Sequence, residues 1–298
     1  MKKKMLFVIN PKSGKAQIKN HLLKVTDIFI KNGYEVTVHI TQRKGDAAKV
    51  VAADTGNYDM LVCSGGDGTL DEVVTGMVKS GHTIPIGYIP AGSTNDFANS
   101  LKLPKNMEQA ARVVVKGKSF ACDVGTFNED VFVYVAAFGM FTEVSYGTGQ
   151  EMKNLLGHMA YVLEGVKHLT NIKSHKMRFT HSGGVIEGDF IYGMVTNSIS
   201  VGGFKNLTGK NVELDDGEFE VTLIRLPKNP IELNKLITAL VDKNVENDFI
   251  YWFKTAKLKV ESKAEVAWTL DGEFGGNHKK VMIENHKGAM DIMVPTDL

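Results

Sequence analysis

The stretch 64–69, Ser-Gly-Gly-Asp-Gly-Thr, restricts the fold of this chain more than any other part of the sequence. It follows an apolar run, 59–63, which predicts a buried strand, and precedes an amphipathic segment, 70–78, which predicts a helix. Its three glycines let a ligand approach the backbone, and a helix start offers unpaired N–H groups to an anion. The order predicts a phosphate-binding turn, with an ordinary strand-to-helix turn as the alternative.

Asp67 lies among these glycines, and a carboxylate beside phosphates normally requires a cation between them. The stretch therefore implies Mg²⁺ together with a nucleotide.

The composition describes an ordinary globular protein of about two domains, with 298 residues and 43% apolar content. The net charge of +1 gives no overall electrostatic field that attracts nucleic acid, and we do not expect the protein to bind nucleic acid. Cys63 and Cys122 lie in apolar runs, which predicts buried thiols in a reducing compartment. The longest apolar run, 131–141, is shorter than the ~20 residues that cross a bilayer. We expect a cytoplasmic protein.

The first part of the chain alternates between strand and helix patterns. Strands are expected at 5–9, 35–40, 59–63 and 84–89, with a further strand at 119–124. This alternation predicts an α/β domain with a parallel sheet. Polar turns follow the first four strands, at 10–14, at Thr41, at 64–69 and at 90–96. Ligands bind beyond the carboxyl ends of parallel strands, so one site can use all four turns.

Near residue 125 the sequence pattern changes from alternating strands and helices to strands typical of hairpins. Strands are expected at 130–138, 176–181, 185–195, 219–226, 257–261, 266–270 and 279–283, and a helix at 230–242. We predict an α/β domain over residues 1–125 and a β-rich domain over 126–298, whose last residues can return to the first domain.

Taken together and in this order, the motifs resemble the diacylglycerol kinase catalytic family of bacterial lipid kinases, which is related to sphingosine and ceramide kinases. The resemblance rests on 10–14 (NPKSG), Thr41, 65–69 (GGDGT) with Glu72, 90–96 (PAGSTND), Asp123, 215–217 (DDG) and 270–273 (LDGE). It implies an N-terminal domain similar to those of NAD kinase and phosphofructokinase, a C-terminal β-sandwich, and an active site in the cleft between them.

The resemblance also implies roles for individual residues. ATP would be bound by Asn10, Pro11, Lys12, Ser13, Gly14, Thr41, Gly66, Asp67, Gly68, Thr69, Leu70, Asp71, Glu72 and Thr94. Asp67, Asp96 and Asp123 would engage Mg²⁺ through waters, and Glu273 would be the general base. Without the upstream motifs, 270–273 would be a strand followed by a tight turn.

A second, structural Mg²⁺ is implied at Asp216, held also by the backbone carbonyls of Glu213 and Glu218. The alternative for these acidic residues is a solvated turn. The sequence departs from the family at Ser93, where relatives often carry threonine, and at 124–128, where the likeness is loosest.

The implied reaction is transfer of the ATP γ-phosphate to diacylglycerol, which gives phosphatidic acid. The alternatives are a kinase of another lipid, of the phosphatidylglycerol or sphingoid type, an NAD kinase, and a nucleotide-binding regulator without catalysis. The turn at 10–14 and the position of 270–273 favour the lipid kinases over NAD kinase. The family also suggests a homodimer.

A membrane lipid as acceptor implies peripheral contact with the inner face of the membrane. Basic side chains for this contact are Lys153, His158, Lys167, His168, Lys173, His175, Lys176 and Arg178. A solvated helix face is the alternative for this run.

Overall fold

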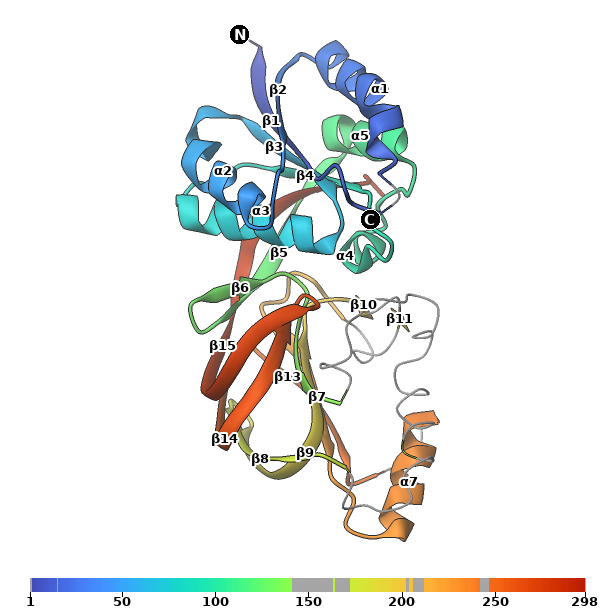
Figure 1. The fold of residues 1–298 in the computed structure, drawn as a ribbon, viewed down its shortest axis with the longest axis vertical. Helices are drawn as coiled ribbons and strands as arrows, with labels where there is room; N and C mark the ends of the chain where they lie inside the picture. The colour runs from blue at the N-terminus through green and yellow to red at the C-terminus, as the bar shows by residue number, and fades with distance from the viewer. Residues whose placement is uncertain are drawn as a thin grey trace. The chain divides into compact units, whose positions relative to one another are not determined.

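The computed structural model describes residues 2–14, 16–140, 163, 172–201, 204–205, 212–241 and 247–297. The chain divides into two compact units (Figure 1). Unit 1 comprises Met1–Val124 and His286–Leu298, and unit 2 comprises Gly125–Asn285. Two strands pass from one unit into the other, β5 (Lys118–Phe127) and β15 (Glu273–Val294).

Unit 1 is built on a parallel sheet in the order β4-β3-β1-β2. Its strands are β1 (Lys3–Ile9), β2 (Tyr34–Ile40), β3 (Met60–Gly65) and β4 (Ile86–Pro90). The end of β15 adds a further parallel strand beside β4, with Ile292 opposite Ile86. β3 and β4 are buried along their whole length, as expected of parallel strands that are covered on both faces.

Two pairs of helices cover the two faces of this sheet (Figure 1). α1 (Ile18–Lys31) and α5 (Met107–Lys116) pack on one face, where Phe29 meets Phe7 edge to face with ring centroids 5.5 Å apart. α2 (Asp46–Asp54) and α3 (Asp67–Ser80) pack together on the other. A Cβ on Gly76 would lie 2.6 Å from the Ala48 carbonyl oxygen, so glycine permits this close contact. Two short helices, η1 (Thr55–Asn57) and α4 (Asp96–Ser100), complete the unit.

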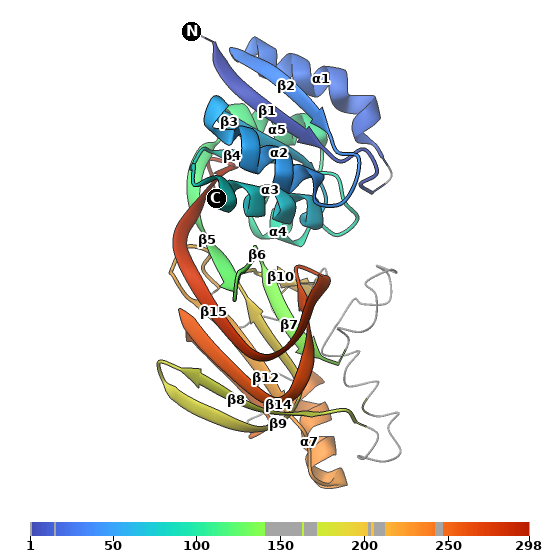
Figure 2. The ribbon, with the colours of Figure 1, turned by 60° about the vertical axis from the view of Figure 1, so that its left-hand side comes forward.

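Unit 2 is dominated by antiparallel strands in the order β13-β12-β9-β7-β14-β15. β8 pairs with both β9 and β14 (Figure 2), and β6 pairs with β5. These strands are β6 (Asp130–Phe132), β7 (Val135–Gly139), β8 (His175–His181), β9 (Gly184–Thr196), β12 (Phe219–Arg225), β13 (Ile250–Thr255) and β14 (Lys257–Leu270). The remaining described elements are β10 (Ser200–Val201), β11 (Phe204–Lys205) and α7 (Pro230–Val241).

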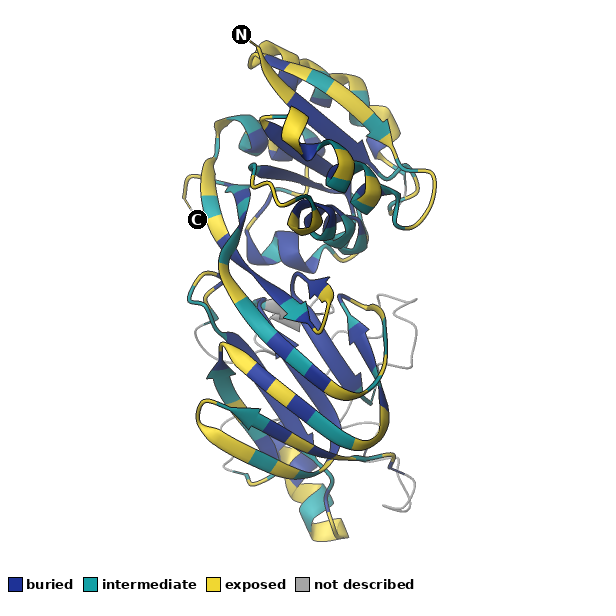
Figure 3. Cartoon of the chain, turned by 90° about the vertical axis from the view of Figure 1, so that its left-hand side faces the viewer, coloured by how far each residue is buried: buried dark blue, intermediate teal, exposed yellow. Residues whose placement is uncertain are grey.

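An aromatic core stabilises unit 2. Trp268 is buried in it and contacts Phe127 and Phe138 at centroid distances of 5.1 and 4.9 Å. Buried and exposed residues alternate along parts of β14 and β15 (Figure 3), so one face of these strands packs on the core and the other meets solvent.

The sequence-based assignment of unit 2 differs from several of the described strands. The strand expected at 279–283 is only part of β15, and β10 and β11 were not expected. The single strand expected at 130–138 is two strands, β6 and β7. The two strands expected at 257–261 and 266–270 form one long strand, β14, whose pairing with β15 shifts between Glu261 and Val266. β13 was not expected.

Asp271 causes the break between β6 and β7. Its carboxylate accepts hydrogen bonds from the backbone amides of Val133, Tyr134 and Val135 at 2.6, 3.0 and 2.8 Å. Asp271 is 5% exposed and has a φ of +49°, a left-handed conformation in the turn between β14 and β15. One buried carboxylate therefore holds this turn against the start of β7.

We predict that Asp271→Ala lowers the free energy of unfolding by about 3 kcal/mol, because three buried amides lose their acceptor. Asp271→Asn should cost less, since asparagine keeps one acceptor oxygen and tolerates positive φ. Asp130→Ala, at an exposed aspartate on β6, is the control and should change stability by about 0.5 kcal/mol at most. Urea unfolding followed by circular dichroism measures all three, and a loss in Asp271→Ala no larger than in the control would contradict this role.

A second buried carboxylate, Glu220, lies opposite Lys254 in the pairing of β12 with β13. Glu220 is 5% exposed, and its Oε1 is 3.2 Å from Lys254 Nζ. Burial raises the pKa of Glu220 from 4.5 to about 7, although the ammonium of Lys254 opposes the shift. The folded state therefore keeps this proton over a pH range in which the unfolded chain has lost it.

Stability should consequently fall as pH rises from about 4.5 to about 7. Glu220→Gln is uncharged at every pH and removes this contribution. Between about pH 5 and about pH 8 we expect wild type to lose about 1–3 kcal/mol of unfolding free energy relative to Glu220→Gln. Parallel pH profiles for the two proteins would show that Glu220 does not titrate in this range.

Candidate functional site

The N-terminus of α3 directly follows the carboxyl end of β3. Gly66 precedes the helix in extended backbone, with φ −90° and ψ −175°, and brings no side chain to cap it. The first amides of a helix lack a carbonyl partner one turn earlier, and the helix dipole is positive at this end. A Cβ on Gly65 would lie 2.4 Å from Thr69 Cβ, so a larger residue there would displace Thr69. This turn suits a phosphate group.

Two other turns of the same sheet edge contact this one. A Cβ on Gly92, after β4, would lie 2.7 Å from Gly66 Cα. Gly14, after β1, has a φ of +55°, and a Cβ there would lie 2.2 Å from the Ala91 carbonyl oxygen. The turns after β1, β3 and β4 therefore meet backbone to backbone through glycines.

Asn10 connects the turns after β1 and β3. Its side-chain amide donates to Thr69 Oγ1 at 3.0 Å, and its own backbone amide donates to the Ser64 carbonyl at 2.9 Å. Its Oδ1 accepts the amide of Lys12 at 3.0 Å. Asn10 thus fixes the course of the chain through 10–14, where the Lys12 side chain is exposed to solvent.

Asp67 and Asp96 are brought together by the same packing. The Asp67 carboxylate accepts the amide of Asp96 at 2.9 Å and that of Phe97 at 3.4 Å, at the start of α4. Asp96 is 2% exposed. Burial raises the pKa of the Cys63 thiol, and the charges of Glu72 and Asp67 raise it further, so this thiol is unreactive.

Asp123 is fully buried on β5, within unit 1. Its Oδ1 accepts the amide of Gly288, from the part of β15 that returns to this unit, at 2.8 Å. The carboxylate joins the two strands.

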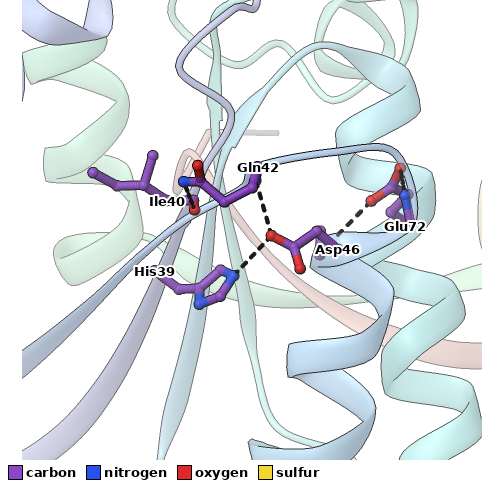
Figure 4. A network of polar contacts seen from close by, with 7 residues as sticks. His39, Ile40, Gln42, Asp46 and Glu72 are labelled. Carbon is purple, nitrogen blue, oxygen red and sulfur yellow. Dashed lines mark hydrogen bonds and ion pairs between the residues drawn. The ribbon is translucent and has the colours of Figure 1, made fainter.

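Glu72 on α3 caps the neighbouring helix α2 (Figure 4). Its carboxylate accepts the amides of Gly45 and Ala47 at 2.6 and 3.2 Å. Asp46 at the start of α2 accepts the amide of Gln42 at 2.9 Å and lies 3.3 Å from His39 Nε2. The hydrogen bond from Gln42, with His39 and Arg43, lowers the pKa of Asp46 despite some desolvation. This network fixes the turn after β2.

The other residues expected to contact ATP differ in which of their atoms are available to a ligand. Thr41 donates its amide to the Ile9 carbonyl at 2.9 Å, which places it beside Asn10. Thr94 is exposed, and its hydroxyl can reach solvent. The Leu70 side chain is 1% exposed and packs in the core, so only its backbone can meet a ligand. The remaining residues of this group lie in or next to the turns already described: Pro11, Ser13, Gly68 and Asp71.

Asn95 was not expected to be part of the site. It has a φ of +52°, and its side-chain amide bonds both the N–H and the C=O of Gly92, at 2.9 and 2.8 Å. Asparagine between Thr94 and Asp96 is itself a turn signal that sequence reasoning can use, because asparagine tolerates left-handed backbone.

Glu273 belongs to unit 2 and begins β15, two residues after Asp271. Its side chain is exposed. The buried bonds of Asp271 hold the turn, so a solvent-facing carboxylate is placed on a rigid hairpin.

The second predicted metal site includes the turn before β12. Asp216 Oδ1 accepts the amide of Glu218 at 2.9 Å, and its Oδ2 accepts from Lys254 Nζ at 2.7 Å. The Glu213 side chain is exposed. Within the described ranges, no group of three His, Cys, Asp or Glu side chains is arranged to hold a metal ion. Because an ammonium already neutralises Asp216, these contacts do not themselves fit a metal ion, and the site stays a prediction from the resemblance.

Half of the predicted membrane patch lies outside the described residues, namely Lys153, His158, Lys167 and His168. Of its remaining members, Arg178 pairs with Glu187 at 2.9 Å. Among the helices that the structure describes, none is long and apolar enough to span a bilayer.

The residues of unit 1 fit a nucleotide with Mg²⁺. Gly65 and Gly66 bring no side chains to the turn before α3, the Asp67 carboxylate stands at the start of that helix, and the backbone amide of Asp96 binds it. Carboxylate oxygens with water are the ligands that Mg²⁺ prefers.

Comparison with known proteins identifies the family. Residues 4–127 match the diacylglycerol kinase catalytic domain. A diacylglycerol kinase of Staphylococcus aureus (strain bovine RF122 / ET3-1) is 32% identical, over 100% of this chain and 94% of the relative. That of Bacillus subtilis (strain 168) is 32% identical, over 92% of this chain and 91% of the relative.

The fold is also that of a solved structure. The crystal structure of a diacylglycerol kinase from Bacillus anthracis strain Sterne matches with a TM-score of 0.76 and 22% identity, over 98% of this chain and 97% of that one. The glycine turns, the paired aspartates and these full-length relatives agree, and the chain belongs to the diacylglycerol kinase family.

Proposed function

We propose that this lipid kinase transfers the γ-phosphate of ATP to the hydroxyl of diacylglycerol and so makes phosphatidic acid. The observation that carries this proposal is the meeting of three glycine turns at the N-terminus of α3, beside Asp67 and Asp96. Phosphoryl transfer depends mainly on positioning and on neutralising charge. The turns would position the phosphates, and the carboxylates would hold the Mg²⁺ that neutralises their charge.

Unit 1 would bind the nucleotide. The amides at the start of α3 would receive the phosphates, with the turn 10–14, Thr41 and Thr94 around them. Asp67, Asp96 and Asp123 would hold Mg²⁺ through waters, and the ion would neutralise the charge that develops on the phosphoryl oxygens. Asp67 and Asp123 also bond backbone amides, so their positions are fixed before the ligand arrives.

Glu273 of unit 2 would act as general base. As the lipid hydroxyl oxygen bonds to the γ-phosphorus, the bond from that phosphorus to the bridging oxygen breaks and ADP leaves. The hydroxyl proton passes to the Glu273 carboxylate. Phe274, next in the chain, is 70% exposed, which suits contact with an acyl glycerol. Peripheral membrane contact, a cytoplasmic location and a homodimer remain predictions.

The direct test is transfer of labelled γ-phosphate to dioctanoylglycerol in mixed micelles with Mg²⁺, with the product identified as phosphatidic acid by mass spectrometry. We predict that Glu273→Gln lowers kcat about 10²–10⁴-fold, with nucleotide affinity unchanged. Glu265→Gln, at an exposed glutamate on β14, is the control and should keep full activity. Labelling of phosphatidylglycerol, sphingosine or NAD in place of diacylglycerol would reassign the acceptor.

Gly66 offers a separate test of the phosphate site. A Cβ there would lie 3.4 Å from both Gly92 Cα and Ser13 Oγ, an ordinary contact, and φ is −90°. Gly66→Ala should therefore leave the unfolding temperature unchanged yet weaken binding of Mg²⁺ and AMP-PNP about tenfold or more, because the methyl group stands where the phosphate approaches.

Gly92→Ala is the matched variant, since its Cβ would lie 2.7 Å from Gly66 Cα. It should destabilise the fold. Nucleotide affinity equal to wild type in Gly66→Ala would place the phosphates elsewhere.

A further inference from the structure

We propose that Tyr88 is a positioning residue for the nucleotide site, because its hydroxyl fastens the turn after β4 to the turn after β3. This inference rests on the proposed function, and it assigns a role to a side chain that the resemblance leaves without one.

The Tyr88 side chain points from β4 into the space between the two turns. Tyr88 is 1% exposed, and its hydroxyl lies 3.3 Å from the Gly65 carbonyl oxygen and 3.4 Å from Asn95 Oδ1. Burial raises the pKa of this phenol well above its ordinary value, and the charges of Asp67 and Asp96 add to the shift. The hydroxyl therefore keeps its single proton at every physiological pH and donates it to one acceptor at a time.

The bond to Gly65 sets the direction of the next amide. The Gly65 carbonyl also accepts the amide of Ala91 at 2.7 Å, so it points toward β4, and the Tyr88 hydroxyl reinforces this direction whenever it donates there. In a trans peptide the C=O and the N–H point in opposite directions. The N–H of Gly66 consequently points away from β4, toward the side of β3 on which β1 and the turn 10–14 lie. That is the direction in which a phosphate would meet both turns.

The bond to Asn95 sets the position of Asp96. Asn95 closes its own turn through two hydrogen bonds to Gly92, and Asp96 follows it as the first residue of α4. Asp96 in turn donates its amide to Asp67. One hydroxyl thus links the amide that receives the phosphate to the pair of aspartates that would engage Mg²⁺.

A buried tyrosine in unit 2 provides a matched control. Tyr134 is 7% exposed, and its hydroxyl also donates to a backbone carbonyl, that of Asp271, at 3.3 Å. Tyr134→Phe and Tyr88→Phe each remove one buried hydroxyl and leave the ring in place. They should therefore lower the unfolding temperature by similar amounts, and only Tyr88→Phe should weaken nucleotide binding.

The experiment is calorimetric titration of wild type, Tyr88→Phe and Tyr134→Phe with AMP-PNP and Mg²⁺, together with KM for ATP and for dioctanoylglycerol. For Tyr88→Phe we expect the nucleotide Kd and the KM for ATP to rise together, about five- to tenfold, with the KM for the lipid unchanged. Tyr134→Phe should keep the wild-type nucleotide Kd. A Tyr88→Phe Kd within twofold of wild type, or an equal loss in Tyr134→Phe, would overturn the proposal.

A double-mutant comparison tests whether Tyr88 acts through Asn95. Asn95→Gly keeps the left-handed backbone and removes the side-chain bonds. Both changes break the hydrogen bond between Tyr88 and Asn95, so Tyr88→Phe should weaken nucleotide binding much less in the Asn95→Gly background than in wild type. Fully additive losses of binding free energy would contradict a role of Tyr88 through Asn95. If wild type binds AMP-PNP but phosphorylates no lipid, the proposed lipid kinase activity is refuted. The role of Tyr88 is still tested in that case by comparing the nucleotide Kd values of wild type and Tyr88→Phe.

Discussion

The close approach of two glycine backbones, at Gly66 and Gly92, is the constraint on which the site in unit 1 depends. A methyl group on Gly92 would come within 2.7 Å of Gly66 Cα, so any larger residue there would push the turns after β3 and β4 apart. Their contact lets Asp67 reach the first amides of α4, and thereby places Asp96. The sheet brings the strand ends together, and the missing side chains let the turns close into one surface.

Both units use a carboxylate to organise backbone amides next to a residue with a proposed role in chemistry. In unit 1, Asp67 accepts the amides at the start of α4, and in unit 2 Asp271 accepts three amides and holds the turn that carries Glu273. Hydrogen bonds from several amides to one carboxylate are strong because they are charge-assisted. Such a turn is rigid before substrate binds, which lowers the cost of ordering the reacting groups.

Local patterns were sufficient to predict β1 to β5 and the glycine turn before α3, because an apolar run, a turn and a helix start follow one another in the sequence. The end of β15, which pairs with β4, was not predicted as a strand. Unit 2 was harder. The break at Val133 and Tyr134 is imposed by Asp271, far along the chain, and no local pattern contains that information. The capping of α2 by Glu72 is equally non-local. Contacts of this kind depend on how strands pair, and periodicity does not determine the pairing.

In the proposed function, three separate turns of unit 1 form one nucleotide site. Hydrogen–deuterium exchange, with and without AMP-PNP and Mg²⁺, tests it most directly, because it reports on individual backbone segments. We expect amides in 10–14, 65–70 and 91–97 all to exchange more slowly when the nucleotide is bound, while those in α7 do not change. Protection that is absent, or confined to one of the three turns, would contradict it.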